Sequence, residues 1–149
     1  MPELPEVEVV RAGLAAHVSG CVVREVEVLH ARSVRAQSDG ARGFISSLTG
    51  ARITDVQRRG KYMWLVTDRS PVVLHLGMSG QVLIDRGRVP ASAHTRILLR
   101  FQRPVTTVRF EDQRMFGGMH SDDWAVAADG RDVPSAVAHI APDVFESTF

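Results

Sequence analysis

The sequence has almost no cysteine, since Cys21 is the single one among 149 residues. A lone cysteine excludes an internal disulfide and a cysteine-rich zinc site within these residues, so we expect no metal or other cofactor on this chain. Long hydrophobic runs are also missing, and the first residues are acidic where a secretory signal would be basic and then apolar. We therefore expect a cytoplasmic protein with no membrane segment.

Lysine is equally scarce, because Lys61 is the single lysine in a sequence with 17 arginines. An ammonium can release and regain a proton where a guanidinium cannot, which makes this position a candidate for proton transfer. Residues 1–110 carry 16 basic against 9 acidic side chains, and residues 111–149 carry 2 against 8. The basic excess suits a surface that meets phosphates, although a solvated surface of mixed charge explains the same balance.

Apolar periodicity predicts a helix from about Pro5 to Val18, a strand over 22–30 and a short helix over 41–48. Six further strands are expected at 51–58, 62–67, 72–76, 81–84, 95–101 and 106–111. Their short intervals are typical of antiparallel β-sandwiches or barrels, so the fold is mainly β with a leading helix. The length fits a single domain over 1–149, with one more short helix at 135–140.

The amino terminus can act as a chemical group. Met1 precedes a small residue, the usual context for removal of the initiator methionine, and its loss frees the secondary amine of Pro2. An α-amino group titrates near pH ~8, against ~10.4 for lysine, so it can attack a sugar carbon and form an iminium. Glu3 and Glu6 can then move protons. Alternatively, Pro5 starts a helix whose positive end these carboxylates complement.

The string Pro2-Glu3-Leu4-Pro5-Glu6-Val7-Glu8 resembles the signature of formamidopyrimidine-DNA glycosylases in both sequence and position. The resemblance implies that Pro2 attacks C1′ of a damaged nucleotide, expels the oxidised base and promotes elimination of the flanking phosphates. It also implies that Glu3 helps to open or protonate the sugar and that Glu6 is a supporting carboxylate.

The segment Arg58-Arg59-Gly60-Lys61-Tyr62 leads from a basic turn into an apolar strand. By itself it is equally a hairpin with a solvated basic tip. The resemblance places Lys61 in the active-site cleft, in contact with the phosphate and as a proton donor in the elimination step.

The segment from His75 to Gly80 resembles the family's loop after a central strand. There the resemblance implies that His75 approaches a backbone phosphate and that Met78 enters the duplex. The alternatives are a strand-end histidine and a methionine that fills a gap in the core. Flanking glycines favour a protruding loop instead.

The segment from Asp112 to Gly117 matches the family's Asp-x-Arg-x-Phe-Gly loop. The resemblance implies that Arg114 fills the hole left by the extruded nucleotide and that Phe116 wedges beside it. Attack at C1′ requires such base flipping, and an apolar wedge with a forked donor can fill the void. His94 matches a DNA-contacting histidine less closely, and a strand-start histidine with no role is the alternative.

These motifs together imply a two-layer antiparallel β-sandwich with an N-terminal helix, of the glycosylase N-terminal catalytic domain type. The implied protein is a monomer that acts on damaged double-stranded DNA, close to the nucleoid. It removes 8-oxoguanine and formamidopyrimidines and nicks the strand by β,δ-elimination. The alternatives are an endonuclease-VIII-like enzyme for oxidised pyrimidines and a non-catalytic DNA-binding domain of the same fold.

Family members continue into a helix-two-turn-helix and zinc-finger half. The resemblance therefore implies that residues 133–149 begin a linker to that half, that one zinc ion belongs there, and that this chain is excised or truncated. Since much of the salt-dependent DNA affinity comes from phosphate contacts, we expect this piece alone to be weakly active or inactive.

Overall fold

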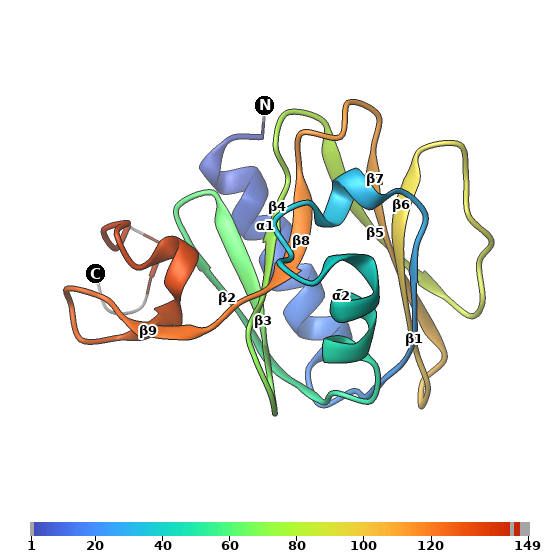
Figure 1. The fold of residues 1–149 in the computed structure, drawn as a ribbon, viewed down its shortest axis with the longest axis horizontal. Coiled ribbons are helices and arrows are strands. Elements are labelled where there is room, and N and C mark those ends of the chain that lie inside the picture. The colour runs from blue at the N-terminus through green and yellow to red at the C-terminus, as the bar shows by residue number, and fades with distance from the viewer. Residues whose placement is uncertain (1, 144, 147–149) are drawn as a thin grey trace.

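The computed structural model of the chain describes residues 2–143 and 145–146 (Figure 1). The elements, in chain order, are α1 (Leu4–Val18), β1 (Val23–Val28), the 3₁₀ helix η1 (Ala31–Val34), α2 (Gly40–Leu48), β2 (Ile53–Arg59), β3 (Tyr62–Thr67), β4 (Val72–His75), β5 (Gly80–Arg86), β6 (Thr95–Phe101), β7 (Thr106–Asp112), β8 (Gly118–Ser121), β9 (Trp124–Val126), β10 (Asp132–Pro134) and the 3₁₀ helix η2 (Ser135–Val137).

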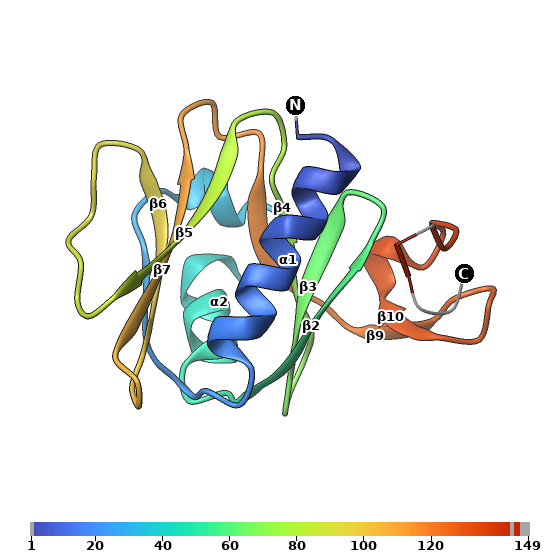
Figure 2. The ribbon, with the colours of Figure 1, turned by 180° about the vertical axis from the view of Figure 1, so that it is seen from behind.

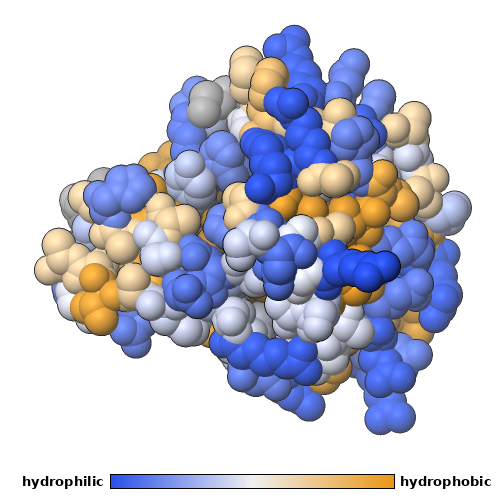
Figure 3. Space-filling view, in the orientation of Figure 1, coloured by the Kyte–Doolittle hydropathy of each residue, from blue (hydrophilic) through white to orange (hydrophobic). Residues whose placement is uncertain are grey.

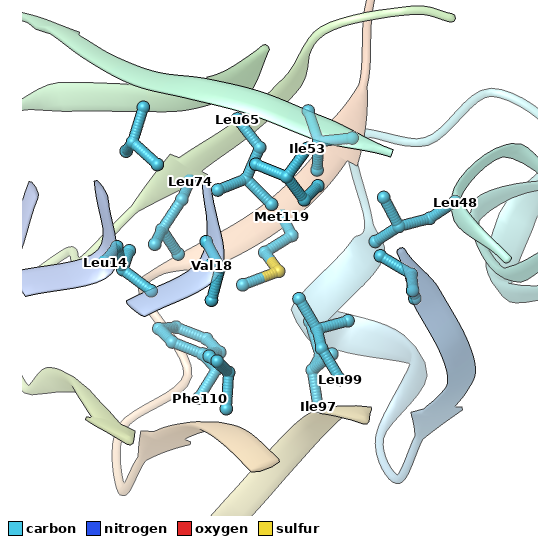
Figure 4. Packing of buried hydrophobic residues seen from close by; sticks show 14 of the residues in the cluster. Leu14, Val18, Leu48, Ile53, Leu65, Leu74, Ile97, Leu99, Phe110 and Met119 are labelled. Atoms are coloured by element: carbon cyan, nitrogen blue, oxygen red, sulfur yellow. The ribbon is translucent and has the colours of Figure 1, made fainter. Parts of the chain in front are cut away.

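Two four-stranded antiparallel sheets form the body, with strand orders β1-β6-β7-β5 and β2-β3-β4-β8. Their inner faces meet in one core, where Leu65 and Leu74 of one sheet lie across from Leu99 and Phe110 of the other (Figure 4). Alternating apolar residues on each strand supply this core, since successive side chains of a strand point to opposite faces. The predicted antiparallel β-sandwich is confirmed.

The two long helices close the open sides of the sandwich. Helix α1 contacts the edge strands β2 and β5, and α2 contacts the edge strands β1 and β8. Figures 1 and 2 show them on opposite sides of the molecule, each between the sheets. Leu14 and Val18 of α1 and Phe44 and Leu48 of α2 are fully buried at helical spacing. None of these helices, within the described chain, is long and apolar enough to cross a membrane.

Residues 124–140 cover the outer face of the second sheet. The β9–β10 hairpin and η2 place Val133 and Val137 on Trp64 of β3, which forms a second small core. The predicted helix at 135–140 is wrong in length, because only Ser135–Val137 is helical. The N–H groups of Ala138 and Ile140 bond three residues back, to the carbonyls of Ser135 and Val137, so the segment forms short 3₁₀-type turns and not a continuous α-helix. The remaining predicted elements match the structure to within two residues at each end.

Candidate functional site

The site lies at the end of the molecule where α1 begins, and Figure 3 shows hydrophilic side chains gathered there. Pro2, just before α1, lines a cleft of about 480 Å³ with Glu6 and Met78. It also lines a narrower recess with Lys61 and His75. Five of the predicted site residues, from three separate segments of the chain, therefore converge on the amino terminus. Met1 lies outside the described residues.

Lys61, which lines this recess, forms a long ion pair with Glu3, the residue after Pro2. The Nζ of Lys61 lies 3.9 Å from Oε2 of Glu3, and their side chains are 37% and 74% exposed. An ion pair this exposed is weak. Both groups therefore remain available to a ligand that enters beside Pro2.

His75 ends β4 and pairs across the sheet with Tyr62 at the start of β3. Their rings stack with centroids 4.5 Å apart. Burial lowers the pKa of His75, the Arg35 guanidinium lowers it further, and Asp112 opposes both. The neutral imidazole is therefore favoured at pH 7, and in this form it offers a ligand one N–H donor and no charge.

Hydrogen bonds and close backbone contact join the β4–β5 loop to the β7–β8 loop. Buried Asp112 accepts a hydrogen bond of 2.6 Å from Ser79 Oγ and one of 2.8 Å from the Gly117 N–H. Gly77 has φ +62, and a Cβ there would lie 2.5 Å from the Gly117 nitrogen. Only glycine fits both the left-handed backbone and this close approach.

The tips of these two loops present apolar and basic side chains to solvent. Met78 and Phe116 are 47% and 43% exposed, and Arg114 is exposed beside them. Met78 is therefore not a core gap-filler. His94 is also exposed, and its carbonyl accepts the Asp112 N–H at 3.0 Å, so it lies at the base of the β7–β8 loop.

The alternative prediction, a hairpin whose basic tip is solvated, is wrong for the side chains of Arg58 and Arg59. Both side chains are buried, with 1% and 0% exposure. Arg58 binds the carboxylates of Glu8 and Asp143, and Arg59 binds those of two other acidic residues in the C-terminal segment. The acidic excess of residues 111–149 thus neutralises these arginines, and Lys61 is the basic residue of the segment that reaches the recess beside Pro2.

Sequence reasoning missed Arg32 in η1 and Arg35 directly after it; residues 31–35 form the η1 segment. Their guanidinium groups donate hydrogen bonds to main-chain carbonyls of residues 115–117, which belong to the β7–β8 loop. No local pattern marks this contact, because the partners are 80 to 83 residues apart. For a metal ion, the described residues bring together no group of three or more His, Cys, Asp or Glu side chains.

A family model described as the formamidopyrimidine-DNA glycosylase N-terminal domain matches residues 1–119. The formamidopyrimidine-DNA glycosylases of Salinispora arenicola and a Nocardioides species are 47% and 48% identical to the chain, over 100% of its length and 50% of theirs. The chain thus spans about half the length of the curated relatives it matches.

Solved structures show the same likeness. Lactococcus lactis Fpg bound to DNA with an AP site matches with a TM-score of 0.73 and 28% identity, over 80% of this chain and 45% of that one. MutM in complex with DNA containing carbocyclic 8-oxo-G matches with a TM-score of 0.73 and 29% identity, over 80% and 44%. A further Lactococcus lactis complex contains an oxidised pyrimidine in its DNA and matches with a TM-score of 0.72 and 29% identity, over 80% and 44%.

Proposed function

Because the chain belongs to the formamidopyrimidine-DNA glycosylase family, we propose that it is the catalytic part of a base-excision repair enzyme that acts on damaged double-stranded DNA. The position of Pro2 carries this proposal, because it lines both the cleft that holds Glu6 and the adjoining recess that holds Lys61. A nucleophile with a carboxylate and an ammonium close to it are the groups that sugar chemistry through a Schiff base requires.

The proposed reaction begins once Met1 has been removed. The Pro2 nitrogen bonds to C1′ while the glycosidic bond to the damaged base breaks. Glu3 protonates the sugar oxygen so that the ring opens to an iminium, and Glu6 supports the proton transfers. Loss of a proton from C2′ then expels the 3′ phosphate, and Lys61 donates a proton during this elimination. A second elimination removes the 5′ phosphate.

The exposed loop tips are proposed to hold the DNA. Met78 and Phe116 enter the base stack, Arg114 hydrogen-bonds the orphaned base, and His75 and His94 approach the backbone. Met78, His94, Arg114 and Phe116 are exposed, which supports this role, whereas His75 is half-buried. An apolar wedge next to a forked donor suits the void that a flipped nucleotide leaves.

For the substrate, we propose oxidised purines, as in the MutM complex with 8-oxo-G containing DNA. Oxidised pyrimidines are a second candidate, because a Lactococcus lactis relative was solved with such DNA. We also propose that residues 1–149 form one domain, with 133–149 leading towards the half that the longer relatives add. The zinc ion expected in that half stays a prediction.

Borohydride trapping tests the proposed function. Protein whose mass shows that Met1 is absent is mixed with a duplex that contains one abasic site, and the imine is reduced. We expect a covalent protein–DNA adduct, even if turnover is slow, and none with Pro2→Gly in a form that keeps Met1. Absence of an adduct at any protein loading, with Met1 removed, would instead support a non-catalytic DNA-binding domain.

A further inference from the structure

The η1 segment lies beneath the β7–β8 loop and binds its main chain. Arg35 donates from Nη2 to the Phe116 carbonyl at 2.7 Å, and from Nη1 to the carbonyls of Gly117 at 2.9 Å and Met115 at 3.3 Å. Three consecutive carbonyls of one loop thus share a single guanidinium. The planar, forked donor set of arginine is suited to such a contact, whereas an ammonium is a point donor.

Arg32, one turn earlier, strengthens the same contact. Its Nε donates to the Met115 carbonyl at 3.1 Å, and its guanidinium lies 6.0 Å from the centre of the Phe116 ring. Two positively charged side chains, Arg32 and Arg35, therefore contact the loop from the same side. The ring of Phe116, at the tip of the loop, lies near Arg32.

The loop conformation needs such support. Met115 has φ +56, in the left-handed region that side chains other than glycine rarely adopt. A strained residue persists where its surroundings hold it. Here Asp112 and Ser79 hold one side of the loop, and the two arginines hold the other.

The guanidinium of Arg35 is therefore occupied by protein carbonyls. It makes a fourth hydrogen bond, of 3.0 Å, to the carbonyl of Arg32 in its own segment. With its donors engaged in this way, Arg35 differs from an arginine that reaches out to a phosphate. Its contacts point to a role in shaping the loop.

We propose that Arg35, assisted by Arg32, is a positioning residue that preforms the wedge of Arg114 and Phe116, and that it thereby makes the protein select damaged duplex over damaged single strands. This inference rests on the proposed function. A duplex leaves a void when a nucleotide flips out, and the wedge fills it. A single strand leaves no such void, so the chemistry at Pro2 proceeds there without the wedge.

The test compares Arg35→Ala and Arg35→Lys with the unaltered chain. Arg86→Ala serves as the matched control, because Arg86 is exposed at the opposite end of β5 from the loops. The first readout needs no DNA: hydrogen exchange at the amides of residues 113–117. Both Arg35 variants are expected to exchange there about tenfold faster, as loss of charge-assisted hydrogen bonds implies. The control is expected to match the unaltered chain.

The second readout is the rate of borohydride trapping on an abasic duplex and on the same strand alone. Both Arg35 variants are expected to lose about tenfold in the ratio of duplex to single-strand rate, with the single-strand rate unchanged. Arg35→Lys is the more informative variant, because it keeps the positive charge but loses the planar, forked set of N–H donors. Full rescue by lysine would show that charge suffices and would overturn the proposal.

Further outcomes test the positioning role of Arg35 and separate it from the proposed function. Unchanged exchange in the loop, or an equal fall on both substrates, overturns the positioning role. If the unaltered chain forms no adduct with either the duplex or the single strand, the proposed function fails. The hydrogen exchange of residues 113–117 then tests by itself whether Arg35 preforms the loop. A general loss of folding would appear as faster exchange in β6 and β7 as well. In that case Arg32→Ala, which removes one of the loop contacts, repeats the comparison.

Discussion

Arg58 binds Asp143 through two hydrogen bonds of 2.7 and 2.8 Å, across 85 residues of sequence. Asp143 also accepts the Gly60 N–H at 2.9 Å, next to Lys61. Because Arg58 reaches Glu8 of α1 as well, one buried guanidinium joins the helix behind Pro2, the turn that carries Lys61 and the C-terminal segment. The segments that carry Glu6 and Lys61 are thus held together by a guanidinium that lines neither the cleft nor the recess beside Pro2.

Removal of the Asp143 charge is expected to destabilise the fold. Asp143→Asn leaves the buried Arg58 with Glu8 as its remaining carboxylate, and breaking a buried pair from one side costs about 3 kcal/mol. Urea denaturation at pH 7 measures the free energy of unfolding. Asp132→Asn, at an exposed position on β10, is the control and should change it little. Equal losses in the two variants would contradict this account.

The same pair predicts how stability responds to acid. Burial raises the pKa of Asp143, but the bonds from Arg58 and Gly60 outweigh it and bring the value from 3.8 to about 2. A depressed carboxyl pKa stabilises the fold above the unfolded value and loses that effect as pH falls towards the folded value. The stability gap between the unaltered chain and Asp143→Asn should therefore narrow between pH 4 and pH 2. A gap that is constant over this range would refute the assignment.

Contact between the β4–β5 and β7–β8 loops predicts different losses of stability at two glycines. Gly77→Ala and Gly87→Ala both force a side chain into positive φ, at about 1 kcal/mol. At Gly77 the added Cβ also meets the Gly117 nitrogen, whereas at Gly87 it meets nothing within 4 Å. We expect a loss of about 3 kcal/mol for Gly77→Ala and about 1 for Gly87→Ala in thermal or urea unfolding. Similar losses would mean that the loops do not touch.

Much of this architecture follows from the sequence because it rests on local signals. Alternating apolar residues and turn glycines give the strands from Ile53 to Asp112, and helical spacing gives α1. The site residues were predicted from motifs, and the structure places Pro2 and Lys61 beside one recess. No local sequence pattern predicts that Arg58 pairs with Asp143 or that Arg35 binds the β7–β8 loop. Long-range contacts of this kind depend on the completed fold.

His75 is expected to titrate below the ordinary histidine pKa of 6.5, because it is half-buried and lies near Arg35. NMR titration of its ring protons measures this. Arg35→Ala should move the midpoint upwards, since a nearby positive charge is lost, and Asp112→Asn should move it downwards. Stability should fall as pH falls through this pKa, because the folded chain favours the neutral ring. A midpoint at or above 6.5 in the unaltered chain would contradict the geometry.

Lys61→Arg separates the charge of this residue from its proton transfer. The guanidinium keeps a positive group near Glu3 but does not donate a proton at neutral pH. With protein in excess over an abasic duplex, trapping should continue while strand nicking slows about a hundredfold, the scale of general acid catalysis. The ratio of nicked to trapped DNA gives the result. An unchanged ratio would remove Lys61 from the elimination step.

The position of the trapped adduct tests the central claim most directly. After reduction with borohydride, nuclease treatment and trypsin digestion, mass spectrometry locates the sugar remnant on the chain. We predict that it lies on the peptide Pro2–Arg11, at the proline nitrogen, in molecules that lack Met1. A remnant on Lys61, or none on the Pro2 peptide of chains without Met1, would contradict Pro2 as the nucleophile.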